Sequence, residues 1–148
     1  MARVNWMVLC TNTATDTQNT SQLSLLNVVN EISVHLSKPL AKGDTVNVDT
    51  NIRLATLWRR SDRAKGEKVN IRYSWGRKKG LKAPPTTATI DLREFVQNQH
   101  ITSISGIAFD EPGEYQVTAQ IEKIKGGKSR WTTVATLPID VKISAKQA

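Results

Sequence analysis

Hydrophobic residues recur at every second position along most of the chain. In the clearest run, polar residues alternate with four apolar ones: Tyr115, Val117, Ala119 and Ile121. A period of two is typical of a β-strand with one buried and one solvated face. Pro112 and Gly113 form a turn just before this strand. The pattern therefore places Tyr115 in the interior, at the entrance to its strand.

Similar alternation predicts the remaining strands. We expect strands at residues 3–13, 22–36 (broken near Asn30), 46–58, 68–75, 86–92, 101–107 and 131–143. Turn-forming residues separate them at 13–22, 59–66, 76–85 and 125–129, residues 91–98 fit one short helical turn with Leu92, Phe95 and Val96 inward, and residues 144–148 read as a frayed tail. The chain is predicted to be all-β, an antiparallel β-sandwich of about seven to nine strands in a single domain spanning residues 1–148.

A buried tyrosine at a strand entrance needs a partner for its hydroxyl group, and the nearest supply is the backbone just upstream. This arrangement, carried by the segment EPGEYQV from Glu111 to Val117, resembles the tyrosine corner of immunoglobulin-like and fibronectin type III-like sandwiches. The resemblance implies an immunoglobulin-like architecture and no particular function. Trp75 also falls on an inward position, where such sandwiches pack a large hydrophobic residue across the sheets.

Several short segments resemble a bacterial family of small single-domain β-sandwich proteins with no assigned activity. They are VLC at 8–10, Asp16, SLLNVV at 24–29, TLWRR at 56–60 and GEYQV at 113–117. The resemblance implies the same fold and brings no functional residues with it.

Composition narrows the class of protein. The 148 residues are 39% hydrophobic, which is enough to build a core. Cys10 is the only cysteine, so an internal disulfide framework is excluded, and its place in an alternating run favours a small buried hydrophobic residue over a reactive thiol. The chain lacks an apolar run long enough to cross a bilayer and a signal-peptide pattern at its start, so we expect a cytoplasmic protein with no membrane span.

The positive charge is local. Residues 59–82 contain ten Lys or Arg and two acidic residues, a balance that equals the net charge of +8 of the whole chain. The candidate anion-binding cations of this segment are Arg59, Arg60, Arg63, Lys65, Arg77, Lys78, Lys79 and Lys82. A third cationic turn adds Lys123, Lys125, Lys128 and Arg130.

These cations are expected at several loop ends. If strands 46–58 and 68–75 were neighbours, loops 59–66 and 76–85 would form two separate basic tips, and the third turn would lie opposite Tyr115. Clustered cations attract nucleic-acid phosphates, anionic membranes or acidic proteins. The alternative is that they are solubilising loops. The only aromatic residues in the segment, Tyr73 and Trp75, fall on core positions, so base stacking is not favoured.

The sequence offers no catalytic or metal-binding pattern. His35 and His100 are its only histidines and lie far apart, and no nucleophile elbow or complete phosphate loop is present. We therefore expect no metal, no cofactor and no enzymatic activity; an enzyme would need a pocket uniting a histidine with a carboxylate. The leading prediction is a non-catalytic binding or assembly module that acts through loops or an edge strand on a protein partner or a second copy. The alternative is sequence-nonspecific nucleic-acid binding through the basic loops 59–82 and 123–130.

Overall fold

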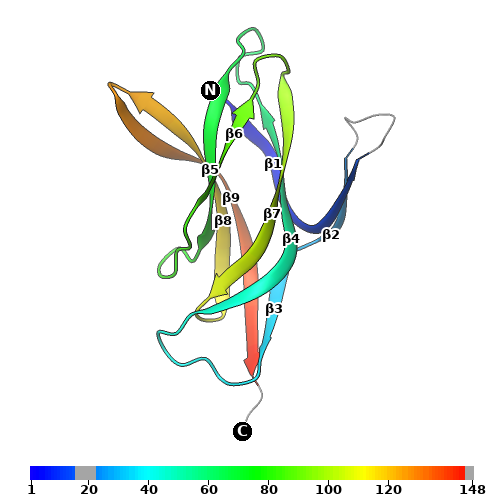
Figure 1. Ribbon diagram of the computed structural model, residues 1–148, viewed down its shortest axis with the longest axis vertical. Helices are drawn as coiled ribbons and strands as arrows, with labels where there is room; N and C mark the ends of the chain where they lie inside the picture. The colour runs from blue at the N-terminus through cyan, green and yellow to red at the C-terminus, as the bar shows by residue number, and fades with distance from the viewer. Residues whose placement is uncertain (16–22, 146–148) are drawn as a thin grey trace.

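Two β-sheets face each other across one interior in this computed structural model, which describes residues 1–15 and 23–145 (Figure 1). In spatial order, the first sheet holds β2 (Leu23–Val28), β1 (Arg3–Thr15), β4 (Val46–Arg59) and β7 (Gln97–Phe109). The second holds β3 (Glu31–Leu36), β9 (Lys128–Ala145), β8 (Gly113–Lys125), β5 (Lys68–Gly76) and β6 (Thr86–Asp91). The described residues thus form nine strands, and the predicted all-β sandwich is confirmed.

One strand pair departs from the predicted antiparallel arrangement. β3 and β9 run parallel, with Glu31 opposite Asp140. The chain crosses from one sheet to the other near Asn30, where the sequence predicted a break in the strand. The Val29 N–H still donates to Leu9 O in the first sheet, whereas the Asn30 carbonyl accepts from Asp140 N in the second. Because the chain crosses without reversing, β3 enters the second sheet in the same direction as β9.

The strands β4 and β5 are not neighbours, contrary to the assumption made from the sequence. β4 belongs to the first sheet and β5 to the second, so residues 60–67 carry the chain across the sandwich. A crossing of this kind depends on how distant strands pair, which local alternation does not reveal.

The short helical turn expected at residues 91–98 does not form, and the described residues contain no helix that might cross a bilayer. Leu92 instead exchanges two backbone hydrogen bonds with Glu67, and the Asp91 carboxylate accepts from Arg93 N. In these contacts the backbone of Leu92 bonds to a distant residue, so it is not used in a helical turn. Leu92 is buried as expected, but Phe95, expected inward, is 66% exposed.

The core has two connected parts. The larger one is built around Trp58, Ile71 and Ile121, and the smaller one around Phe109 and Tyr115. Alternation assigned Trp58, Ile71, Tyr115 and Ile121 to inward positions correctly, because each strand is covered on one face by the opposite sheet.

Cys10 is fully buried, with Arg53 as its cross-strand neighbour on β4. Burial raises the pKa of its thiol, and the nearby Arg53 charge only partly opposes that rise. The residue therefore fits the predicted role of a small buried hydrophobic residue better than that of a reactive thiol.

The ends of two predicted segments need adjustment. β9 continues through Ser144 and Ala145, which the sequence assigned to a frayed tail, and Ser144 Oγ lies 2.6 Å from His35 Nδ1 on β3. Likewise Ala14 and Thr15, which the sequence placed in the turn alone, belong to β1. The rest of that turn (residues 16–22, including Asp16) and of the tail (146–148) lie outside the described residues.

Candidate functional site

Arg60, one of the candidate anion-binding residues, is committed to the fold. It is 8% exposed, and its guanidinium donates hydrogen bonds to the carbonyl oxygens of Leu92 (2.6 Å), Arg63 (2.8 Å) and Arg93 (2.9 Å). These bonds tie the β4–β5 connection to the β6–β7 connection. Each of its three nitrogens donates to a backbone carbonyl, so Arg60 has a structural role within the fold, and its predicted contact with an anion stays a prediction.

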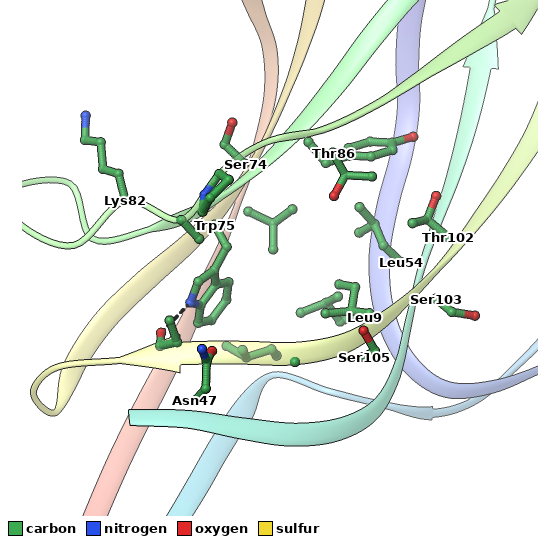
Figure 2. A pocket seen from close by; sticks show the side chains of 18 of the residues that line it. Leu9, Asn47, Leu54, Ser74, Trp75, Lys82, Thr86, Thr102, Ser103 and Ser105 are labelled. Atoms are coloured by element: carbon green, nitrogen blue, oxygen red, sulfur yellow. Dashed lines mark hydrogen bonds between the residues drawn. The ribbon is translucent and has the colours of Figure 1, made fainter. Parts of the chain in front are cut away.

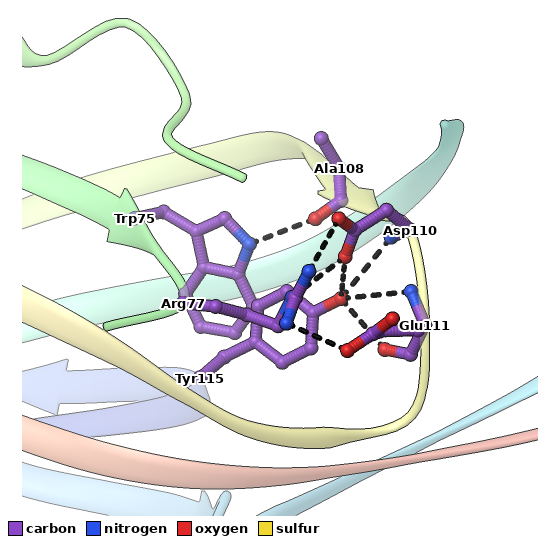
Figure 3. A network of polar contacts seen from close by, with 6 residues as sticks. All are labelled: Trp75, Arg77, Ala108, Asp110, Glu111 and Tyr115. Carbon is purple, nitrogen blue, oxygen red and sulfur yellow. Dashed lines mark hydrogen bonds and ion pairs between the residues drawn. The ribbon is translucent and has the colours of Figure 1, made fainter. Parts of the chain in front are cut away.

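Arg77 is likewise neutralised, at the opposite end of the sandwich. Its Nε and Nη2 each lie 2.8 Å from an oxygen of Asp110, and its Nη1 lies 2.7 Å from Glu111 Oε1 (Figure 3). A two-pronged contact of this kind is the strongest form of an arginine–carboxylate pair. Arg77 thus fastens the β5–β6 loop to the turn before β8, and it offers no free charge to a partner.

The remaining candidates of the segment are accessible but divided. Arg59 is partly exposed, and the others are exposed: Arg63 and Lys65 in one loop, and Lys78, Lys79 and Lys82 in the other. The loops lie at opposite ends of the sandwich, since Gly76 pairs with Gln116 beside the Tyr115 turn, whereas Lys68 begins β5 at the far end. The sequence placed the loops at opposite ends only for the case that β4 and β5 are neighbours; the strands are not neighbours, and the loops lie at opposite ends because β5 runs between them.

The Tyr115 hydroxyl sits at the centre of a polar network (Figure 3). It accepts from the backbone N–H groups of Asp110 (3.1 Å) and Glu111 (3.3 Å), and lies 2.7 Å from both Asp110 Oδ1 and Glu111 O. Burial raises the pKa of this phenol, and the Arg77 guanidinium is the main cause that lowers the pKa of the Asp110 carboxyl. The predicted bond from a buried tyrosine to the backbone upstream is confirmed.

Trp75 completes this region as an inward residue. Its ring stacks on Tyr115 with the centroids 5.2 Å apart and meets Phe109 edge-on at 5.9 Å. Its Nε1 donates to Ala108 O at 2.9 Å. The corner is therefore a structural joint whose polar groups and rings all have partners.

The tip of the β8–β9 hairpin is arranged differently. It projects away from the two sheets at the upper left of Figure 1 and turns at Gly126 and Gly127, whose positive φ values suit a tight hairpin. Directly opposite residues of a strand pair share one face. The hairpin register pairs cation with cation twice, Lys123 with Arg130 and Lys125 with Lys128. Four cations therefore share one face of the ribbon, and none makes an ion pair with any residue in the described ranges.

A cleft of about 400 Å³ opens between the edge strands β6 and β7, with the β5–β6 loop along one side (Figure 2). Its floor is apolar, with side chains from several strands: Leu9, Leu54, Ile104, Ile107 and Val117. Trp75 lies on one flank and the polar rim includes Ser103 and Ser105. An apolar depression with a few polar groups at its rim is the usual form of a binding site.

The strand β7 borders this cleft with a free edge. Among the described residues it pairs with β4 alone, although it is 13 residues long. Thr50 Oγ1 donates to Ile104 O at 2.9 Å, so the Ile104 carbonyl points toward β4. Backbone groups of successive strand residues point to opposite sides, so the N–H and C=O groups of Ser103, just before the register shift in this strand pair, are directed toward the cleft.

The two histidines lie in different surroundings on different sheets. His35 on β3 is exposed, and His100 on β7 contributes Nδ1 to a buried group of hydroxyls, 3.1 Å from Tyr73 Oη. Tyr73 in turn lies 2.8 Å from Thr56 Oγ1, and burial lowers the pKa of His100. Within residues 1–15 and 23–145, no three His, Cys, Asp or Glu residues gather in a metal-binding arrangement.

The sequence did not identify the cleft or the free edge of β7. The only local signal is the weak alternation of Ser103 and Ser105 with apolar neighbours, and it does not say which strand ends a sheet.

No protein-family model matches the chain, and no curated protein sequence matches it.

Proposed function

We propose that the protein is a non-catalytic binding or assembly module that accepts an extended segment of a protein partner along the free edge of β7. The observation that carries this proposal is the position of β7, a 13-residue strand that pairs only with β4 among the described strands, beside an apolar cleft of about 400 Å³. A free edge offers a row of backbone donors and acceptors that an added strand satisfies. Alternate side chains of that strand would enter the cleft, and this supplies selectivity.

We also propose that the protein is cytoplasmic and that it belongs to the bacterial family of small immunoglobulin-like sandwiches that its short motifs resemble. A cytoplasmic setting agrees with a lone buried cysteine. The partner is either another protein or a second copy of this chain, since strand addition needs only backbone complementarity and a few apolar side chains.

The test replaces one outward backbone donor. Ser103→Pro removes the N–H that faces the cleft, and proline is tolerated on an edge strand because no ladder bond inside the sheet is lost. Ser103→Ala is the matched control, since it removes the hydroxyl and keeps the N–H. Each tagged variant is used to capture partners from an extract of the native cell, and light scattering reports self-association.

We expect wild-type protein and Ser103→Ala to retain the same partner or the same oligomer, and Ser103→Pro to lose it. Hydrogen exchange of the complex should show new protection at Ser103. A wild-type protein that is monomeric and captures nothing contradicts the proposal, as does a partner retained equally by Ser103→Pro.

A further inference from the structure

We infer that the cationic face of the β8–β9 hairpin, formed by Lys123, Lys125, Lys128 and Arg130, is a binding surface for the phosphate backbone of a nucleic acid. This surface is separate from the β7 cleft, so the inference does not rest on the proposed strand addition. It also revises the sequence-based alternative, because the structure leaves residues 59–82 as two divided loops with two of their arginines engaged.

The first argument is the arrangement of the charges. Both cross-strand pairs of the tip are like-charged, and like charges directly opposite each other destabilise a strand pair. The acidic residue nearest in the hairpin, Glu122, pairs with Trp131 and therefore lies on the other face. Its carboxylate binds Ser129 Oγ and Asn70 Nδ2 and makes no ion pair with any of the four cations. A polyanion would relieve this repulsion.

The second argument is spacing. Residues two apart on a strand are separated by about 6.6–6.8 Å, and each of the two levels of the ribbon carries two cations. The face thus holds about one positive charge per 3.4 Å of its length, which is about the charge that one strand of a duplex presents per length of the helix axis. An extended acidic peptide presents carboxylates on one face only every 6.6–6.8 Å or so, about half that density.

The third argument is shape. The tip stands clear of the sheets as a two-stranded ribbon, which is an element that the major groove of duplex DNA admits. A membrane surface fits less well. The exposed apolar residue of the tip, Ile124, is 70% exposed but pairs with Ser129 on the face opposite the cations. A bilayer attracted by the cations would therefore not take up this side chain.

The experiment measures fluorescence anisotropy of labelled duplex DNA, duplex RNA and single-stranded DNA with the full chain at several salt concentrations. The hairpin variant changes Lys123, Lys125, Lys128 and Arg130 to Gln. The control variant removes the same charge elsewhere by changing Arg63, Lys65, Lys78 and Lys79 to Gln. These four side chains are exposed and make no ion pair with the described residues.

We expect wild-type protein to bind at least one of these nucleic acids, and the three probes to distinguish DNA from RNA and duplex from single strand. The hairpin variant should weaken binding by about tenfold or more at moderate salt. Four lost phosphate contacts on a duplex should reduce the slope of log affinity against log salt by about 3.6. The control variant should change affinity by less than about threefold, as a loss of long-range attraction would.

Several results would overturn the inference. They are no binding by wild-type protein at low salt, equal weakening in both variants, or binding to poly-glutamate or phosphatidylserine vesicles in place of nucleic acid. Circular dichroism establishes that the hairpin variant remains folded, which we expect because the change removes two like-charge pairs. Ser103→Pro should keep full nucleic-acid affinity, so failure of this inference and failure of strand addition are distinguishable.

Discussion

The Tyr115 corner and the tip of the β8–β9 hairpin lie at opposite ends of the same strand and treat charge in opposite ways. At the corner, one arginine meets two carboxylates and a buried hydroxyl meets four backbone or carboxylate groups. At the tip, four cations share one face and have no acidic partner among the described residues. Charge at the corner is paired within the fold, whereas charge at the tip has no acidic partner among the described residues and is the charge that we propose binds nucleic acid.

The difference shows that basic residues close together in the sequence can have different structural roles. Arg77 and Lys78 are adjacent in the sequence, but Arg77 is held by Asp110 while Lys78 is exposed. A function assigned from charge alone would treat them as equivalent. Their geometry divides the positive charge into a part that joins loops and a part that is free.

The largest effect is expected at the corner. Tyr115→Phe keeps the fully buried ring and removes the hydroxyl, which leaves the Asp110 and Glu111 N–H groups without their acceptor. Leaving a buried donor unsatisfied typically costs about 1–3 kcal/mol, and because these two donors are only partly buried we expect the free energy of unfolding to fall by about 1–2 kcal/mol. Urea denaturation measures this as a lower midpoint at unchanged slope.

The control for this variant is Lys79→Gln, at the same end of the sandwich. Its side chain is exposed, and a surface change of this kind usually alters stability by less than about 0.5 kcal/mol. If Tyr115→Phe lowered the free energy of unfolding no more than Lys79→Gln does, the hydroxyl network would not be what stabilises the Tyr115 corner.

A smaller effect is expected from pH. The Arg77 guanidinium holds the pKa of Asp110 below its ordinary value of 3.8, so the folded protein binds that proton less readily than the unfolded chain. The corresponding stability is complete above about pH 4 and is lost as pH falls through the folded pKa. The Asp110 side chain is 21% exposed, which limits the gain through solvent screening.

Asp110→Asn should therefore lose stability at neutral pH and show a weaker decline in acid than the wild type. The free energy of unfolding, measured by urea denaturation from neutral pH to about pH 2, checks this. Asp91, whose pKa Arg93 lowers to about 2, contributes a decline in the same range to both proteins and cancels in the difference. Parallel curves for the two proteins would contradict the assignment.

The sequence predicted the features that depend on neighbouring residues. Alternation from Tyr115 to Ile121 located the strand and its inward tyrosine, because both the turn and the backbone groups that bind the hydroxyl lie within five residues. The same reasoning did not reveal the contacts of Arg60 and Arg77, whose main partners lie 32 and 33 residues away. No local pattern distinguishes these arginines from their exposed neighbours.

Features set by strand order were also beyond local reasoning. The parallel pairing of β3 with β9 and the free edge of β7 are decided by which distant strands come together. The cleft follows from that order, because it opens where each sheet ends in an edge strand. The β8–β9 hairpin could be predicted from the sequence only in part. Its turn and its cations were visible in the sequence, and its register supplied the fact that all four share a face.

The smallest effect is expected at the tip, and it has the opposite sign. Lys128→Glu converts the Lys125–Lys128 pair from repulsive to attractive. Exposed cross-strand pairs of opposite charge contribute a few tenths of a kcal/mol, so stability should rise by about 0.5 kcal/mol, and less at high salt. Lys79→Glu makes the same change of charge in the β5–β6 loop, outside any strand pair, and should gain nothing comparable. Equal gains in the two variants would attribute the effect to net charge. A gain confined to Lys128→Glu, together with weaker nucleic-acid binding, would show that the hairpin gives up stability to keep its cations free.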